Sequence, residues 1–407
     1  MEGYNKKVIM SYWTICRMKT TKKIYVKVSI IFLLGGILLF SSCEKEENQK
    51  IEANRKTLFM YLPWSSNLTN YFYNNISDLE KCITKIGLNN EKVIVFISTG
   101  STEAMMFEIV SSHGRCKREI LKKYKSPPFT TIDGITAILN DVKAFAPASV
   151  YTMIIGCHGM GWLPVYEMKV RSAPHMKMHW EYQGVPLTRY FGGLTAEYQT
   201  DIKSLASGIA NAGMKMEYIL FDDCYMSSIE VAYELKDVTK YLIGSTSEMM
   251  AYGMPYAAIG EYLLGNPDYQ SGCEEFYNFY STYEIMPCGT LAVTDCSELE
   301  NMAAIIKSIN SKYSFDKSLR GTIQRLDGYT PVIFYDFADY ITSLCNDPIL
   351  LNQFREQLNH LVPYKTHTKN FYTMAKGIIP INTFSGITTS DPSDNPMTCL
   401  LYTSDAA

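Results

Sequence analysis

Two residues that could carry out nucleophilic chemistry each follow an apolar run in this sequence. His158 comes shortly after the run 149–156, and Cys224 comes three residues after the run 215–221. A thiolate is a strong nucleophile and an imidazole exchanges protons near neutral pH, so the two could form a nucleophile and acid/base pair. Each has an ordinary interpretation as well, because a buried cysteine often acts as a small apolar side chain. The two residues can act as a catalytic pair only if the fold brings them together.

The neighbours of both residues fit this chemistry. Gly159 follows His158, and a glycine lets its backbone N–H approach a substrate carbonyl, as an oxyanion hole requires. Cys224 precedes a segment with helical periodicity. We expect the positive end of that helix dipole to favour the thiolate form of Cys224.

The elements that position these residues alternate along the chain. Apolar runs predict strands at 57–62, 92–98, 105–110, 149–156, 215–221 and 241–244, and periodic segments predict helices at 68–86, 133–145, 195–212 and 227–238. This alternation predicts an α/β fold with a mostly parallel sheet and helices on both faces. The carboxyl ends of parallel strands meet at one edge of a sheet, so His158 and Cys224 should lie close together there.

The pattern continues less regularly beyond residue 260. It predicts helices at 274–284, 297–311 and 348–361, and strands near 289–294 and 331–334. Residues 57–260 are expected to form the catalytic core. Residues 261–398 are either the C-terminal part of the same body or a subdomain.

Several segments of the chain together resemble the clostripain family of cysteine peptidases. They are 154–162 around His158, 221–236 around Cys224, 241–248 and 253–256. The resemblance implies a caspase-like fold and endopeptidase activity after Arg or Lys. It implies that Cys224 is the nucleophile, that His158 is the acid/base, and that the amides of Gly159 and Cys224 hold the oxyanion.

Two acidic residues are further candidates for substrate binding. The resemblance places Asp222 under the pocket for a basic side chain, although Asp222 could instead cap the following helix. Glu248 either contributes to that pocket or is structural, and Asp223 is expected to be a cap or a solvated turn residue. The stretch 249–252 departs from the acidic, proline-containing stretch common in the family. The primary specificity therefore stays open at this point.

The start of the chain has the pattern of an export signal. Four lysines between residues 19 and 27 precede the apolar run 28–40 and the sequence Ser41-Ser42-Cys43. This resembles the lipobox of bacterial lipoproteins, in which Cys43 would be lipidated, while an uncleaved membrane anchor is the alternative. We expect residues 1–42 to be the signal, 43–56 a charged tether, and the protein to be lipid-anchored in the bacterial cell envelope, at the outer membrane or cell surface.

Composition excludes several classes of protein. The 407 residues are 47% apolar, which is typical of a globular chain. The formal charge is −3, but residues 1–42 hold seven basic residues and one acidic residue, so the remainder carries about −9. This balance argues against nucleic-acid binding. Cysteine spacing shows no CxxC pair, and His175 with His179 lacks further ligands, so neither a disulfide framework nor a metal site is expected. No cofactor is expected, with calcium dependence left open.

The interval between His158 and Cys224 contains Lys169, Arg171 and Lys177. Members of the resembled family commonly cut themselves at a basic residue in this interval, so these three residues are candidates for autoprocessing of a zymogen. Ordinary solvated charges are the alternative. The tail 399–407 matches nothing expected and resembles translated adapter sequence.

The resulting hypothesis is a cysteine endopeptidase that acts on protein or peptide substrates with a Cys–His dyad. The alternative is a catalytically silent clostripain-like surface lipoprotein that acts as a binding protein.

Overall fold

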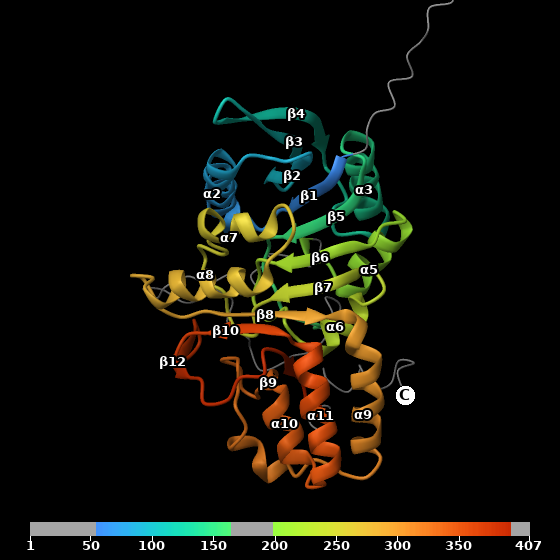
Figure 1. Cartoon of the computed structure of the whole chain (residues 1–407), viewed down its shortest axis with the longest axis vertical. Helices are drawn as coiled ribbons and strands as arrows, with labels where there is room; N and C mark the ends of the chain where they lie inside the picture. Colours follow the sequence, from blue (N-terminus) through green and yellow to red (C-terminus); the bar gives the residue numbers. More distant parts are fainter. Residues whose placement is uncertain (1–53, 164–197, 392–407) are drawn as a thin grey trace, which may run out of the picture. The chain divides into compact units, whose positions relative to one another are not determined.

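A nine-stranded mixed sheet forms the centre of the protein. The computed structural model describes residues 54–163 and 198–391 (Figure 1). In spatial order the strands are β10 (Tyr364–His367), β8 (Thr290–Asp295), β7 (Thr239–Gly244), β6 (Met216–Phe221), β5 (Ala148–Ile155), β1 (Asn54–Leu62), β2 (Glu91–Gly100), β3 (Glu103–Ser112) and β4 (Arg115–Lys125). The five adjacent strands from β7 to β2 are parallel, and the flanking pairs are antiparallel.

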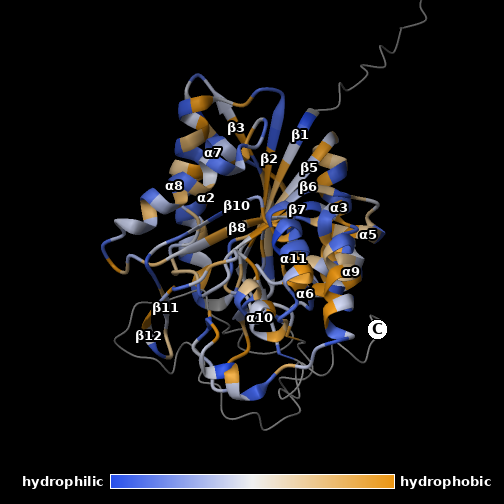
Figure 2. Ribbon diagram, turned by 60° about the horizontal axis from the view of Figure 1, so that its bottom comes forward, coloured by the Kyte–Doolittle hydropathy of each residue, from blue (hydrophilic) through white to orange (hydrophobic). Residues whose placement is uncertain are grey.

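Helices cover both faces of the sheet, as Figure 2 shows. One face carries α2 (Thr69–Ile86), α7 (Tyr256–Leu263) and α8 (Tyr269–Ser281), and the other carries α3 (Ile132–Phe145), α5 (Ile202–Asn211), α6 (Ile229–Leu235) and α9 (Leu299–Asn310). Because both faces are covered, the middle strands are continuously apolar: every residue of β2 from Val93 to Ile97 is fully buried. The predicted α/β architecture is confirmed.

The C-terminal part is built into the same body. Residues Ala53–Ala407 form one compact unit, and strands β8 and β10 belong to the central sheet. Two further helices, α10 (Phe337–Leu344) and α11 (Pro348–Leu361), follow β8 and α9 in the chain. Two small strand pairs complete this part, β11 (Asn370–Thr373) with β12 (Gly377–Pro380) and β9 (Tyr335–Asp336) with β13 (Thr388–Thr389).

Several sequence predictions need correction. Strand β1 begins at Asn54, inside the expected tether 43–56. The expected strand at 331–334 is not one, and only Tyr335–Asp336 pairs there. The helix expected at 227–238 is the shorter α6, whose N-cap Ser228 accepts a hydrogen bond from the Val231 amide. Strand β4 was missed because its residues are mostly basic and exposed.

A segment near residue 390 is hydrogen-bonded to the loop that follows Cys224. We call residues Ser385–Asp391 the strap. Its Thr388 amide donates to the Ser227 carbonyl at 3.0 Å, and the Ser227 hydroxyl donates to the Gly386 carbonyl at 2.8 Å. At the far end of the strap, Asp391 forms an ion pair with Arg320. The strap therefore links the segment after Cys224 to the region around Arg320.

None of the eight cysteines among the described residues forms a disulfide, and six of them are buried. Between residues 54 and 391, leaving out 164–197, no helix has the length and hydropathy needed to cross a bilayer.

Candidate active site

His158 is placed by the end of β5 and oriented by the turn before α2. Its Nε2 lies 2.9 Å from Oδ1 of Asn67. An amide oxygen can only accept a hydrogen bond, so in this contact the imidazole carries a proton on Nε2. Asn67 thus fixes the direction of the ring. Sequence reasoning missed Asn67, because a lone asparagine in a polar turn carries no signal of this contact.

Cys224 lies in the turn after β6, with its side chain fully buried. The Met249 amide donates a hydrogen bond to its Sγ at 3.1 Å. A backbone N–H aimed at sulfur stabilises the thiolate relative to the thiol. The expectation that a helix dipole does this is wrong: α6 begins at Ile229, five residues further on, and spans only seven residues. The Met249 amide provides the donor instead.

The residue after Cys224 has a strained backbone. Tyr225 has a φ of 63°, in the left-handed region that non-glycine residues rarely adopt. Its ring stacks on Phe334 with the centroids 4.9 Å apart, and its hydroxyl donates to Glu248 Oε1 at 2.9 Å. Such strain persists only where the surroundings hold it, and it is typical of functional turns.

Gly159 brings the two strand ends into backbone contact. A Cβ atom at this position would lie 2.3 Å from the Cys224 carbonyl oxygen and 3.0 Å from the Cys224 nitrogen. Only glycine allows this approach. The structure therefore places the Gly159 backbone directly against that of Cys224, as the strand-end argument expected.

Asp222 is buried and holds the segment that leads into α7. Its Oδ1 accepts from the Met254 amide at 2.8 Å, and its Oδ2 accepts from the Tyr256 hydroxyl at 2.9 Å. The helix-cap alternative is wrong for Asp222, because Ser228 is the cap of α6.

Asp223 faces a different neighbour from Asp222. Its Oδ1 accepts from the Cys157 amide at 2.6 Å, and its Oδ2 accepts from the Cys157 thiol at 3.2 Å. Only 1% of Asp223 is exposed. The expectation of a helix cap or a solvated turn residue is therefore wrong. Asp223 directly precedes Cys224 and is instead hydrogen-bonded to Cys157, which directly precedes His158.

Glu248 is buried between two parts of the fold. Besides the Tyr225 hydroxyl, it accepts a hydrogen bond from the Met374 amide at 3.0 Å through Oε2. Of its two sequence interpretations, these contacts match the structural one: Glu248 supports the strained turn after Cys224.

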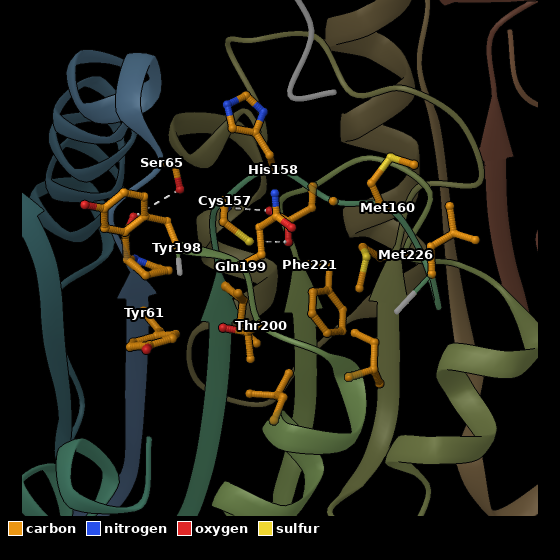
Figure 3. Close-up of a pocket in the computed structure, with 18 of the residues that line it drawn as sticks. Tyr61, Ser65, Cys157, His158, Met160, Tyr198, Gln199, Thr200, Phe221 and Met226 are labelled. Atoms are coloured by element: carbon orange, nitrogen blue, oxygen red, sulfur yellow. Dashed lines mark hydrogen bonds between the residues drawn. The ribbon is translucent and has the colours of Figure 1, made fainter. Parts of the chain in front are cut away.

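A hollow of about 90 Å³ lies beside His158. Figure 3 shows Cys157, Tyr61 and Tyr198 around it, with the His158 ring directed away from the Cys157 sulfur. The hollow is lined by residues at the ends of β1, β5 and β6 and by the start of α5, and most of these side chains are apolar or aromatic.

The other candidates lie outside the described residues. These are Cys43, Lys169, Arg171 and Lys177, together with the tail 399–407. In the described part of the chain, no group of three or more His, Cys, Asp or Glu side chains could hold a metal ion.

Comparison with known proteins gives a family and several related structures. The sequence model of the clostripain family (Peptidase C11) matches residues 60–379. A secreted C11 cysteine protease from Bacteroides thetaiotaomicron, "iotapain", is 58% identical, with 85% of this chain and 95% of that chain covered and a TM-score of 0.78. The comparison with curated proteins finds no match.

Two further structures are similar to this chain. A clostripain from Bacteroides thetaiotaomicron in complex with the peptide inhibitor BTN-VLTK-AOMK is 64% identical over 53% of this chain and 97% of that chain, with a TM-score of 0.51. An inactive zymogen C11 protease from Parabacteroides distasonis is 25% identical, with 85% of this chain and 94% of that chain covered and a TM-score of 0.69. These similarities confirm the predicted caspase-like sheet.

Proposed function

Because the chain belongs to the clostripain family of cysteine proteases, we propose that it is an endopeptidase whose catalytic dyad is Cys224 and His158 and that it cuts after lysine or arginine. The observation that carries the proposal is the contact of the Gly159 backbone with that of Cys224. It places the residue after the histidine against the cysteine, as a shared site requires.

The proposed mechanism follows from the contacts of these residues. The Cys224 thiolate, stabilised by the Met249 amide, attacks the carbonyl carbon of the scissile bond. The amides of Gly159 and Cys224 stabilise the resulting oxyanion. His158 holds a proton on Nε2 toward Asn67, so Nδ1 is the ring nitrogen that takes up the proton from the Cys224 thiol and then donates it to the leaving amine. Water then hydrolyses the acyl-enzyme, with His158 taking up the proton. These steps need no metal or organic cofactor.

The proposed preference for a basic residue rests on Asp222. This carboxylate is buried two residues before Cys224, and a buried negative charge attracts a substrate ammonium or guanidinium group. Both of its oxygens also hold the segment that contains Met254 and Tyr256. In this proposal Asp222 supplies the charge beneath the pocket for the basic side chain, and its two hydrogen bonds hold the segment that forms one wall of that pocket. The inhibitor bound to the 64% identical relative has the peptide sequence VLTK, which ends in lysine and supports this preference.

The dyad is tested by two cysteine variants compared on a fluorogenic lysine peptide. Cys224→Ala should lose nearly all turnover while its melting temperature changes little, because one buried sulfur atom is replaced by a small void. The matched control is Cys157→Ala, which removes the neighbouring thiol and should keep measurable turnover. If Cys157→Ala abolished activity and Cys224→Ala did not, the assignment of the nucleophile would be wrong. Wild-type protein that cleaves no peptide in a diverse library would favour the binding-protein alternative.

We also propose that the protein is exported and anchored by a lipid on Cys43. The sequence of residues 19–43 supports this, and the 58% identical relative is described as secreted. Cys43→Ala should move the protein from the membrane fraction to the soluble fraction after lysis and should abolish labelling by a radioactive fatty acid. Cys16→Ala, which removes a cysteine upstream of the apolar run, is the control. Membrane retention of Cys43→Ala would favour the uncleaved anchor.

A further inference from the structure

We propose that Asp223 is a positioning residue of the active site: it holds the strand ends that carry His158 and Cys224 together, and it keeps the neighbouring Cys157 thiol neutral. The first part rests on the proposed dyad, whereas the second part does not. Neither role follows from the activity itself, because Asp223 does not have to touch the substrate in either of them.

The first part rests on how Asp223 joins two neighbouring loops. Asp223 directly precedes Cys224, and both of its carboxylate oxygens accept hydrogen bonds from Cys157, which directly precedes His158. Figure 3 shows the two bonds as dashed lines from Cys157. The Gly159 backbone also lies close to Asp223, since a Cβ atom added at Gly159 would lie 2.7 Å from the Asp223 Cβ. One side chain therefore sets the separation of the two loops.

The chemical form of Asp223 suits this role. A buried carboxylate is costly unless donors surround it, and N–H···O⁻ bonds to a charged oxygen are short and strong. The bond from the Cys157 amide to Oδ1 is 2.6 Å long. An amide side chain in place of the carboxylate would lose the charge and would turn an NH₂ group toward one of the two donors. The contact is therefore specific for a carboxylate.

The second part concerns the choice between two thiols near one histidine. Cys157 is partly exposed and lines the hollow beside His158, whereas Cys224 is fully buried. Accessibility alone would thus make Cys157 the more reactive thiol. Its sulfur lies 3.2 Å from a carboxylate oxygen, however, and a thiolate there would face a like charge. Asp223 therefore favours the neutral thiol at Cys157, and Cys224 remains as the nucleophile.

Two other titratable side chains, Tyr61 and His158, lie near Cys157, and neither places a positive charge against its sulfur. Tyr61 lines the same hollow, and its pKa is raised well above the usual value, first by burial and then by Cys157. Tyr61 is therefore neutral. His158 has its Nε2 directed to Asn67, and its ring points away from the Cys157 sulfur.

The thiol part is tested in full-length protein that carries Cys224→Ala, so the result does not depend on the proposed dyad. Iodoacetamide alkylation of Cys157 is followed by peptide mass spectrometry, with and without Asp223→Asn. We expect the rate at Cys157 to rise about tenfold or more, because removing a like charge at hydrogen-bond distance from the sulfur favours the reactive thiolate. Cys116, a partly exposed thiol on β4, is the internal control and should keep its rate. An unchanged rate at Cys157 would overturn this part.

The positioning part is tested by kinetics in the otherwise unchanged enzyme. Asp223→Asn should lower kcat by about 10- to 100-fold with little change in KM, since small displacements of reacting groups cost this much. A loss confined to KM, or no loss, would overturn the role. If Asp223→Asn fails to fold, Cys157→Ser and Cys157→Ala replace it: the serine keeps a donor for the carboxylate and should retain more kcat than the alanine. Equal kcat values for these two variants would overturn the role as well.

The two proposals fail in distinguishable ways. If Cys224→Ala keeps its activity, the proposed dyad is wrong, whereas faster alkylation of Cys157 in Asp223→Asn would still support the thiol part.

Discussion

Asp222 and Asp223 are consecutive carboxylates with separate tasks. Residues that leave an extended strand alternate between its two sides, so neighbours in sequence face different layers of the fold. Asp222 turns to Met254 and Tyr256, which lead into α7, and Asp223 turns to Cys157 at the end of β5. The Cys224 turn is thus fixed from two sides.

Removing the Tyr256 hydroxyl tests the support on the Asp222 side. Tyr256→Phe takes one donor from a buried carboxylate, so we expect a loss of about 1–3 kcal/mol in the free energy of unfolding, measured in urea. It should also raise KM for a lysine peptide, because the pocket wall loses its attachment. Tyr277→Phe on α8 is the control: Tyr277 is exposed, and its change should stay within about 0.5 kcal/mol. Equal stability of the two variants would show that the hydroxyl contributes nothing.

The strap shows how an element distant in sequence supports the site. Its Ser390 hydroxyl accepts from the indole of Trp162 at 2.8 Å, and its Ser390 amide donates to Glu230 Oε1 at 2.9 Å. Trp162 lies four residues after His158, and Glu230 lies in the first turn of α6 after Cys224. The strap is therefore hydrogen-bonded to the segments after both proposed catalytic residues.

Glu230 makes this attachment sensitive to pH. Burial is the main cause that raises its pKa from 4.5 to about 7, and the hydrogen bonds from Ser390 and Thr389 only partly offset it. Between about pH 4.5 and 7 the native state keeps a proton that the unfolded chain releases, so stability falls as the pH rises through this window. The loss is complete above pH 7 and amounts to roughly 3 kcal/mol.

Glu230→Gln removes this titration. The variant should be more stable than the wild type at pH 8, and its advantage should vanish near pH 4.5, as measured by melting temperature across this range. Glu234→Gln, an exposed change on the same helix, is the control and should follow the wild-type profile. A constant offset between Glu230→Gln and the wild type at every pH would contradict the account.

The sequence predicts the elements whose patterns are local, and it fails where contacts are distant. Apolar runs identify β5 and β6, and the positions of His158 and Cys224 at their ends follow directly. Strand β4 is not predicted, because an edge strand buries few side chains and tolerates charged residues. The hydrogen-bond partners of Asp223 and His158 are not predicted either. Cys157 lies 66 residues from Asp223 in the chain, and Asn67 lies 91 residues from His158.

At the scale of the whole molecule, the central sheet pairs strands from both sides of the interval that contains the candidate processing residues. Strands β5 and β6 are parallel neighbours, with Ile154 aligned to Leu220 and Ile155 to Phe221. Helix α3, before the interval, packs on α5, after it: the Thr136 hydroxyl lies 3.2 Å from the Gly208 carbonyl. A cut between residues 163 and 198 would therefore leave the two parts joined by the sheet and by this helix pair.

Self-cleavage is expected to produce such a two-part enzyme. Purified wild-type protein should separate into two fragments on a denaturing gel, with the new N-terminus after Lys169, Arg171 or Lys177, yet should elute as one species in gel filtration. Cys224→Ala should remain intact, and mixing it with wild type shows whether the cut occurs between molecules. An active enzyme that stays uncut would leave these three residues as ordinary surface charges.

Four buried thiols, those of Cys82, Cys273, Cys288 and Cys296, affect how the protein tolerates oxidants and reductants. Burial raises the pKa of Cys82 and Cys288 to about 11 and that of Cys273 and Cys296 to about 12, with minor contributions from nearby charges at three of the four. The thiolate is the form that oxidants attack, so these side chains resist oxidation although no disulfide protects them. A cysteine protease needs a reduced nucleophile, and reductants that cleave disulfides destabilise many exported proteins. In the described part of this chain there is no cross-link to lose, so the conditions that keep the nucleophile active leave the scaffold covalently unchanged.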